Sequence, residues 1–211
     1  MPQDAAEKDA PQLYLIAPAL LPASDLSATL LAILDAAPVA CLRLPGVGDE
    51  ATLGRMADIA RDVAHARDVA VVIDDHVQLA LRHGLDGVHL TTGARNVRAA
   101  RKELGADAIV GAYCGASRHD GMNAGEAGAD YVSFGPCGPS ALGQGEPVDP
   151  ALFQWWSEMI EVPVVAEGAL DRILVETLWP IADFIALGPE IWSAEDQAPQ
   201  VIEKLRSIWP D

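Results

Sequence analysis

Charged side chains that could bind an anion or a cation stand directly after two short apolar runs of this sequence. Arg43 lies near the end of the run from Val39, and its guanidinium could bind a phosphate or carboxylate through two parallel hydrogen bonds. Asp74 and Asp75 follow the next run, and Mg²⁺ prefers carboxylate oxygens. We therefore predict Arg43 as a catalytic and phosphate-binding residue and Asp75 with Asp74 as metal ligands. Two plainer alternatives remain open: Arg43 could pair with a neighbouring carboxylate, and one aspartate could cap the following helix.

Three more side chains could take part in proton transfer or anion binding. His89 follows Asp86 and Val88 in an apolar run, and we expect it among the phosphate-binding residues, unless it is a hydrogen-bonded histidine of the core or rim. Arg118 and His119 follow the run at 108–112. They could serve as an anion contact and as a catalytic general acid or base, respectively. The alternative is that both belong to a solvated loop.

Two glycines, Gly168 and Gly188, follow the last two apolar runs. Barrel proteins often bind phosphate with backbone N–H groups from the loops after their seventh and eighth strands. We therefore predict that both glycines bind phosphate. Glu167 and Glu190 flank them, and Pro189 has no N–H to donate, so phosphate binding here is weakened unless the glutamates point away.

The elements that must position these residues alternate regularly along the chain. Short apolar runs are typical of strands buried on both faces, and apolar residues at i, i+3 and i+4 indicate helices. We predict strands over residues 13–17, 39–44, 69–73, 86–90, 108–112, 130–134, 162–166 and 181–187. We predict helices over residues 24–36, 49–67, 76–83, 95–104, 119–127, 149–160, 171–179 and 194–209.

Eight strand–helix units predict an α/β protein with one parallel eight-stranded (β/α)8 barrel. We expect the barrel domain to span residues 12–211 and residues 1–11 to form a disordered leader. An open, doubly wound sheet is the alternative, but no G-x-G-x-x-G motif follows the first run. In a barrel the active site lies at the C-terminal ends of the strands, which is where the candidate residues stand.

Composition excludes several classes of protein. The chain has 211 residues, half of them apolar, and a formal net charge of −17. The apolar content argues against a disordered chain, and the negative charge argues against nucleic-acid partners and anionic membranes. No apolar stretch approaches 18 residues, and the N-terminus lacks the pattern of a signal peptide, so we expect a cytoplasmic protein without membrane association. The oligomeric state is not predicted.

The three cysteines do not form a recognisable metal or redox motif. No C-x-x-C pair occurs, which argues against a zinc ribbon or a thioredoxin-type site. We expect them to be buried, reduced thiols. They are Cys41, Cys114 and Cys137.

Several motifs, in order, resemble the thiamine phosphate synthase family, including its thiazole tautomerase relatives. The resemblance extends over most of residues 12–193 and implies a (β/α)8 barrel. The resemblance further implies that active members join a pyrimidine diphosphate to a thiazole phosphate and release diphosphate. It also implies that Mg²⁺ assists the departure of the diphosphate. The motifs that carry the resemblance are Leu13-Tyr14-Leu15-Ile16, Leu42-Arg43, Val72-Ile73-Asp74-Asp75, Gly84-Leu85-Asp86-Gly87-Val88-His89-Leu90, Gly128-Ala129-Asp130-Tyr131-Val132-Ser133-Phe134-Gly135-Pro136 and Pro163-Val164-Val165-Ala166-Glu167-Gly168.

The chain departs from the family pattern on the diphosphate and metal side. In the family's Q-x-R-x-K stretch, Arg43 matches, but Cys41 stands for Gln and Pro45 for a diphosphate-binding Lys. In the family's N-D pair, Asp74 replaces Asn and Asp75 keeps the metal-ligand position. Thr91-Thr92-Gly93-Ala94 replaces G-Q-x-D, so the second metal carboxylate is missing and the Mg²⁺ site is weakened.

The chain also departs from the family pattern in the loops after the fifth, sixth, seventh and eighth predicted strands. Tyr113 and Pro189 stand where the family has Ser, and the family's T-x-x-K becomes Ser140-Ala141-Leu142-Gly143. The G-G pair of the phosphate cup becomes Gly168-Ala169. Losing a charge-assisted contact costs about 1.5–3 kcal/mol, so several such losses together could abolish the family reaction.

Two classes of function follow from this pattern. The first is a divergent synthase that acts on small phosphorylated heterocycles, with Arg43, Asp75, Arg118 and His119 in new roles. The second is a non-catalytic barrel that binds or senses a small molecule. A metal-free, tautomerase-like enzyme that uses His119 or His89 as acid or base lies between them.

Overall fold

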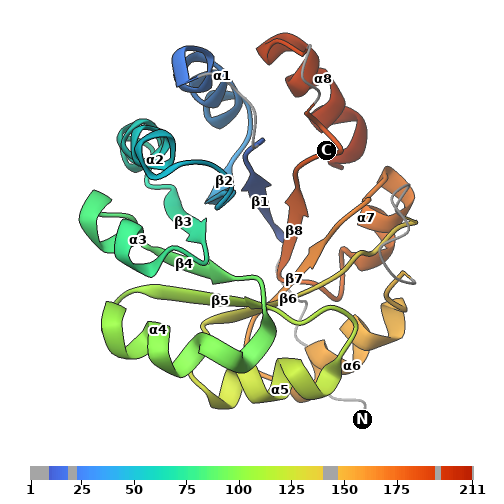
Figure 1. Ribbon diagram of the computed structural model, residues 1–211. Coiled ribbons are helices and arrows are strands. Elements are labelled where there is room, and N and C mark those ends of the chain that lie inside the picture. Colours follow the sequence, from blue (N-terminus) through green and yellow to red (C-terminus); the bar gives the residue numbers. More distant parts are fainter. Residues whose placement is uncertain (1–9, 19–22, 140–146, 193–195, 211) are drawn as a thin grey trace.

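The computed structural model describes residues 10–18, 23–139, 147–192 and 196–210. Eight parallel strands close into a barrel in which each strand pairs with its neighbours in sequence and β8 pairs with β1 (Figure 1). This confirms the (β/α)8 prediction and removes the open-sheet alternative. The strands are β1 (Gln12–Ile16), β2 (Val39–Leu44), β3 (Ala70–Asp74), β4 (Gly87–Leu90), β5 (Ile109–Tyr113), β6 (Tyr131–Phe134), β7 (Val164–Glu167) and β8 (Phe184–Leu187).

An outer ring of helices surrounds the barrel (Figure 1). The clearest, α2, begins after Asp49, whose carboxylate accepts a hydrogen bond from the Thr52 N–H at 2.9 Å. Its apolar face, which includes Leu53 and Met56, is buried against the barrel. The helices are α1 (Ala23–Ala36), α2 (Glu50–His65), α3 (Val77–His83), α4 (Val97–Leu104), α5 (Arg118–Glu126), α6 (Pro150–Met159), α7 (Arg172–Leu178) and α8 (Ala198–Ile208), with a short 3₁₀ helix η1 (Gly93–Asn96) before α4.

Side chains alternate along each strand between two apolar layers. One set packs outward against the helices. The other fills the barrel interior, as expected for a strand whose successive side chains point to opposite faces. The interior cluster comprises Tyr14, Cys41, Val72, Tyr131, Val165 and Ala186, with Ile16, Ala70, Ile109 and Phe184 against it.

Three strands extend one residue beyond their predicted ends. β3 includes Asp74, β5 includes Tyr113 and β7 includes Glu167. Their side chains therefore keep the alternation of the strand, and Asp74 and Glu167 turn inward to meet Arg43 from β2. Because β3 and β7 each extend one residue beyond the predicted end, the carboxylates of Asp74 and Glu167 lie at the mouth of the barrel beside Arg43.

The structure also bears on the predictions for the cysteines, for membrane spans and for the ends of the chain. All three cysteines are free and buried, as expected. None of the helices in the described ranges is long and apolar enough to cross a membrane. Residues 1–9, which form most of the expected leader, and the expected first turn of the last helix at 194–195 lie outside the described residues.

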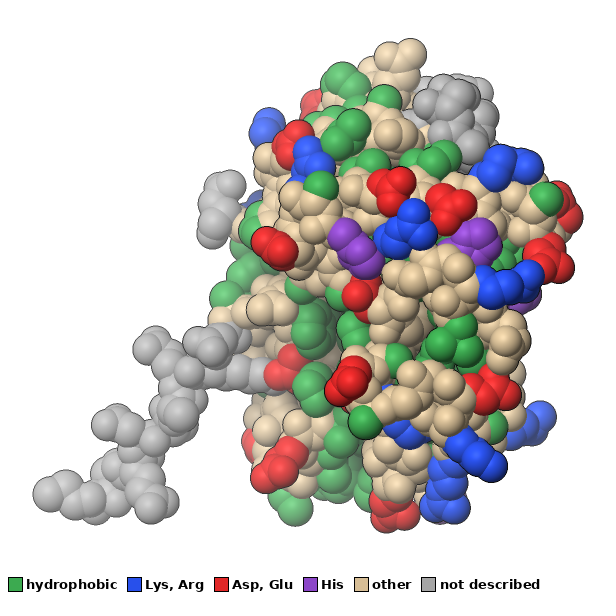
Figure 2. Space-filling model, turned by 90° about the vertical axis from the view of Figure 1, so that its left-hand side faces the viewer, with side chains coloured by type: hydrophobic (Ala, Val, Ile, Leu, Met, Phe, Trp, Pro, Cys, Tyr) green, Lys and Arg blue, Asp and Glu red, His purple; other side chains and the backbone are tan. Residues whose placement is uncertain are grey.

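The face over α2 and α3 carries acidic, basic and histidine side chains close together (Figure 2). Arg61 pairs with Asp58 and Asp62, and Arg82 with Glu50. Charges on this face are therefore partnered within the chain rather than gathered into a basic patch.

Candidate functional site

Arg43 lies at the mouth of the barrel between two carboxylates of the chain itself. Its Nε donates to Asp74 Oδ1 at 2.6 Å, and its Nη2 donates to Asp74 Oδ2 at 3.3 Å. Its Nη1 donates to Glu167 Oε2 at 2.9 Å. The three side chains are only 10%, 16% and 14% exposed, in the order Arg43, Asp74 and Glu167. In the structure Arg43 therefore forms an ion pair with neighbouring carboxylates, which is the plainer of the two interpretations of this residue.

The electrostatics of this group favour a closed network over a free cation. Burial raises the pKa of the Asp74 and Glu167 carboxyls, and the adjacent Arg43 guanidinium opposes that rise. With both carboxylates ionised, Arg43 is over-compensated by one negative charge. An incoming phosphate would share this arginine with two carboxylates that already accept charge-assisted hydrogen bonds from it.

Asp74 and Asp75 are adjacent in sequence but face different neighbours. Asp74 turns to Arg43, whereas Asp75 accepts hydrogen bonds from the Thr91 N–H at 3.0 Å and from the Thr91 hydroxyl. Asp75 has a φ of 55°, an unusual conformation for a residue with a side chain, which accompanies this divergence.

Both of these carboxylates already bind donors of the chain itself. Every carboxylate oxygen of Asp74 and Asp75 already accepts a hydrogen bond from the chain. Among the described residues, no group of three or more His, Cys, Asp or Glu side chains is placed to hold a metal ion. The expectation of Mg²⁺ therefore stays a prediction from the sequence, and no step below depends on it.

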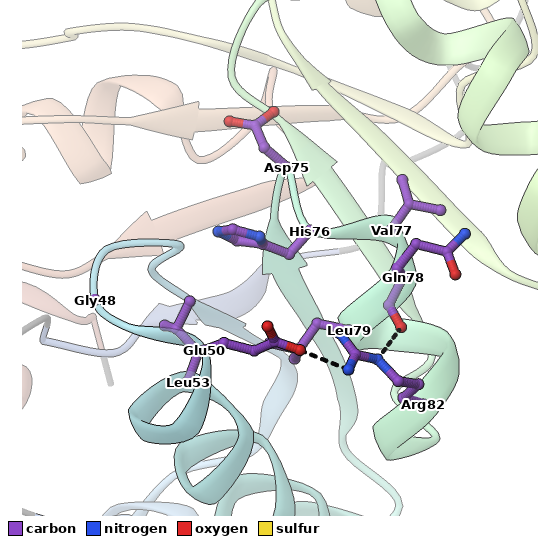
Figure 3. A pocket seen from close by; sticks show the side chains of 9 residues that line it. All are labelled: Gly48, Glu50, Leu53, Asp75, His76, Val77, Gln78, Leu79 and Arg82. Atoms are coloured by element: carbon purple, nitrogen blue, oxygen red, sulfur yellow. Dashed lines mark hydrogen bonds and ion pairs between the residues drawn. The ribbon is translucent and has the colours of Figure 1, made fainter.

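Asp75 also borders two cavities on the outer side of the mouth. One, of about 370 Å³, lies between the start of α2 and α3. Figure 3 shows Asp75 at one edge of this cavity and the ion pair of Glu50 with Arg82 at another. The second cavity, of about 280 Å³, extends toward Thr92 and Glu103.

The Glu190 side chain lies between the loops after β7 and β8, where the sequence predicts a phosphate cup. Glu190 Oε2 accepts a hydrogen bond from the Gly188 N–H at 2.8 Å, and its Oε1 accepts one from the Leu170 N–H at 3.3 Å. Gly168, with a φ of 89°, shapes the loop that presents Leu170. Glu167 points away toward Arg43, whereas Glu190 points into the cup.

His89 lies inside the barrel and not at its rim. It is 1% exposed, and its Nδ1 shares a hydrogen bond with the Tyr131 hydroxyl at 2.9 Å. Tyr131 and Tyr14 hydroxyls are 2.7 Å apart, which completes a buried chain of three side chains. Burial, with help from the nearby Arg43 charge, lowers the pKa of His89 well below its ordinary 6.5. His89 in the structure is therefore the hydrogen-bonded core histidine of the plainer interpretation. Its Nε2 is buried and has no hydrogen-bond partner among the described residues.

Arg118 and His119 begin α5 and are both exposed. The Arg118 guanidinium lies 4.7 Å from the centre of the Trp155 ring on α6, in a cation–π contact. No hydrogen bond or ion pair between described residues joins either side chain to the Arg43 network. Their predicted roles as anion contact and acid or base stay predictions.

The sequence predicts a role for Arg43 but not the contacts of three residues around the mouth, Glu167, Glu190 and Thr91. Glu167 stands beside Gly168, and its contact with Arg43 cannot be read from their spacing. The acidic type of Glu190 near Gly188 is the signal for its contact with the cup. Thr91, which holds Asp75, had no signal beyond its departure from the family pattern. The expected loop position at 140–143 lies outside the described residues.

Comparison with known proteins identifies the family. The family model described as thiamine monophosphate synthase matches residues 13–191. A thiamine-phosphate synthase from Rhodospirillum centenum is 46% identical over 192 residues, which cover 86% of this chain and 89% of that protein. The chain belongs to the thiamine monophosphate synthase family. A thiamine-phosphate synthase from Hyphomonas neptunium is 33% identical and covers 99% of this chain and 98% of its own length.

A solved structure agrees with this assignment at the level of the fold. The thiamine phosphate pyrophosphorylase from Pyrococcus furiosus has a TM-score of 0.75 with 22% identity, over 93% of this chain and 94% of that one. Within the thiamine monophosphate synthase family, the present chain therefore combines the shared barrel with a mouth whose charged groups bind one another.

Proposed function

We propose that the protein joins a pyrimidine diphosphate to a thiazole and releases diphosphate, the reaction that the family resemblance implies for a thiazole phosphate. The observation that supports this is the near full-length similarity to proteins named thiamine-phosphate synthase, at up to 46% identity among those cited. In the transfer, the thiazole ring nitrogen forms a bond to the methylene carbon of the pyrimidine. The bond from that carbon to the diphosphate oxygen breaks, and diphosphate leaves with the electron pair.

The carboxylates at the mouth of the barrel suit the thiazole in this reaction, because the thiazole gains positive charge. The thiazole becomes a thiazolium cation, and preorganised carboxylates favour positive charge that develops during a reaction. Glu167 and Asp74 are held in place by Arg43 and are mostly withdrawn from water, which strengthens their effect. Arg43 is the cation closest to these carboxylates, and it is the residue that we propose contacts the departing diphosphate once a carboxylate yields.

Product formation tests this proposal directly. The purified protein is incubated with the pyrimidine diphosphate and either the thiazole phosphate or the thiazole alcohol, with and without Mg²⁺, and the coupled product is measured by mass. We expect product with the wild-type protein. Arg43→Lys, which keeps the charge but loses the forked geometry, should lower the rate by at least about tenfold.

Arg55→Lys is the matched control, because Arg55 is exposed on α2 and donates a hydrogen bond to Thr52, away from the mouth. It should leave the rate unchanged. No product from either thiazole, in a sample that circular dichroism shows to be folded, would contradict the proposed reaction.

A second candidate is a barrel that binds the heterocycle without joining it to anything. The specific observation in its favour is that three of the five N–H groups of Arg43 already donate to Asp74 and Glu167, so a diphosphate would compete with carboxylates of the chain for this guanidinium. Calorimetry separates the two functions. Heterocycle binding without product supports the second candidate, and product supports the first.

A further inference from the structure

The Glu190 side chain accepts hydrogen bonds from the backbone of its own loop and of the neighbouring loop. The chain turns tightly after β8, with the Ile191 N–H donating to the Gly188 carbonyl at 3.0 Å. The Trp192 indole donates to the Ile16 carbonyl at 2.8 Å, which attaches this turn to β1. Added bulk at Gly188 is not tolerated, because a Cβ there would lie 2.9 Å from the Ile16 Cβ. The turn is therefore held in the position that aims Glu190 at the cup.

The Glu190 carboxylate occupies the cup as an anion would. Its two oxygens accept from one N–H on each of two loops, that of Gly188 after β8 and that of Leu170 after β7. Backbone N–H groups of these loops are the donors with which barrels bind phosphate. Pro189 supplies no further N–H. Within the described ranges, no Lys or Arg forms an ion pair with Glu190, so nothing there would neutralise a second anion.

We propose that Glu190 is a built-in substitute for a phosphate group and that it sets the mouth to accept a thiazole with a free hydroxyl in place of a thiazole phosphate. The identity of the ring rests on the proposed function, whereas the exclusion of phosphate rests on the cup alone. A phosphate dianion at these donors would have to expel the carboxylate and would meet its charge at close range.

The chemistry of the occupied cup defines the ligand end that it prefers. An ionised carboxylate has about four lone-pair directions, and the two N–H groups use two of them. The remaining lone pairs accept hydrogen bonds, so the complementary ligand end is a donor such as an alcohol. A phosphate monoester is mainly an acceptor near neutral pH, and the Gly188 and Leu170 N–H groups already donate to Glu190.

Inorganic phosphate is the first probe, because it reports on the cup without any thiazole. Binding is followed by calorimetry for the wild type, Glu190→Gln and Glu190→Ala. Gln keeps one acceptor oxygen for the loops, and Ala frees both N–H groups. We expect both variants to bind phosphate at least about tenfold more tightly than the wild type, as expected for recovery of charge-assisted contacts. Glu203→Gln, an exposed position on α8, is the control and should bind phosphate like the wild type.

Equal phosphate affinity in the wild type and both variants would overturn the proposal. If the variants do not fold, the wild type alone still decides, because it should bind the thiazole alcohol at least about tenfold more tightly than the thiazole phosphate. Tighter binding of the phosphate by the wild type would overturn it as well. If neither thiazole binds any form of the protein, the proposed function fails, and the phosphate titration still decides the role of Glu190.

Discussion

Arg43 and Glu167 meet across the barrel mouth at 2.9 Å, although 124 residues separate them in the chain. Their contact joins β2 to β7, on opposite parts of the closed sheet. Asp74 completes the group from β3. The Arg43 cation at the mouth is therefore shared between two carboxylates, Asp74 and Glu167.

Glu167→Gln should free much of the Arg43 charge while keeping a hydrogen-bond acceptor beside it. We expect inorganic diphosphate to bind about tenfold more tightly, because one competing charge-assisted hydrogen bond, worth about 1.5 kcal/mol, becomes a neutral one. The free energy of unfolding should change by less than about 2 kcal/mol. The hydrogen bond from Arg43 becomes weaker, but the cost of burying an ionised carboxylate at position 167 is removed. Calorimetry and urea unfolding measure both. Glu161→Gln, on an exposed residue before β7, is the control, and an unchanged diphosphate affinity in Glu167→Gln would count against the network.

His89 should remain neutral well below pH 6.5. Its pKa is depressed in the folded protein because burial disfavours the imidazolium, so the unfolded chain binds the proton more readily. The contribution of this group to stability is therefore present above pH 6.5 and falls as the pH drops below it, by about 1.4 kcal/mol per pH unit until the folded pKa is reached. Ring-nitrogen chemical shifts in the wild type measure the charge directly, and a protonated His89 at pH 6 would contradict the buried geometry.

The buried chain of Tyr14, Tyr131 and His89 should respond unequally to loss of its hydroxyls. Tyr131→Phe leaves both the Tyr14 hydroxyl and His89 Nδ1 without the partner that joins them, whereas Tyr14→Phe leaves Tyr131 bonded to His89. Each orphaned buried group costs about 1–3 kcal/mol, so Tyr131→Phe should be the more destabilising change. Urea unfolding measures the difference. Equal losses would mean that the three groups do not act as a chain.

Mg²⁺ alone should stabilise the protein little. Both oxygens of Asp75 accept hydrogen bonds from Thr91, and both oxygens of Asp74 accept them from Arg43, so an ion would compete with donors of the chain for these carboxylates. We expect the unfolding temperature to rise by less than about 1 °C at millimolar Mg²⁺, because an ion concentration below the dissociation constant supplies less than about 0.4 kcal/mol by linkage. A larger rise that Asp75→Asn abolishes would instead show a metal site at this aspartate.

The sequence by itself determined the architecture and the end of the barrel at which chemistry belongs. Alternating apolar runs and helical patterns identified all eight strands and eight helices, with boundaries that differ from the structure by a few residues. The reason is that burial on both faces of a parallel strand leaves a local signal, and so does the apolar stripe of a helix. The same signals placed Arg43, Asp74 and Gly188 at or beside strand ends without reference to the fold.

Only the tertiary structure decided what these residues contact. Closure of the barrel brings β7 within reach of Arg43, and no local pattern encodes a contact across 124 residues. The alternation along β4 turns His89 into the interior instead of toward a ligand. The direction of the Glu190 side chain depends on a turn held by Trp192 and Ile16 from opposite ends of the chain. Residue type and spacing therefore predict which groups reach the mouth, whereas their pairing depends on distances that exist only once the sheet has closed.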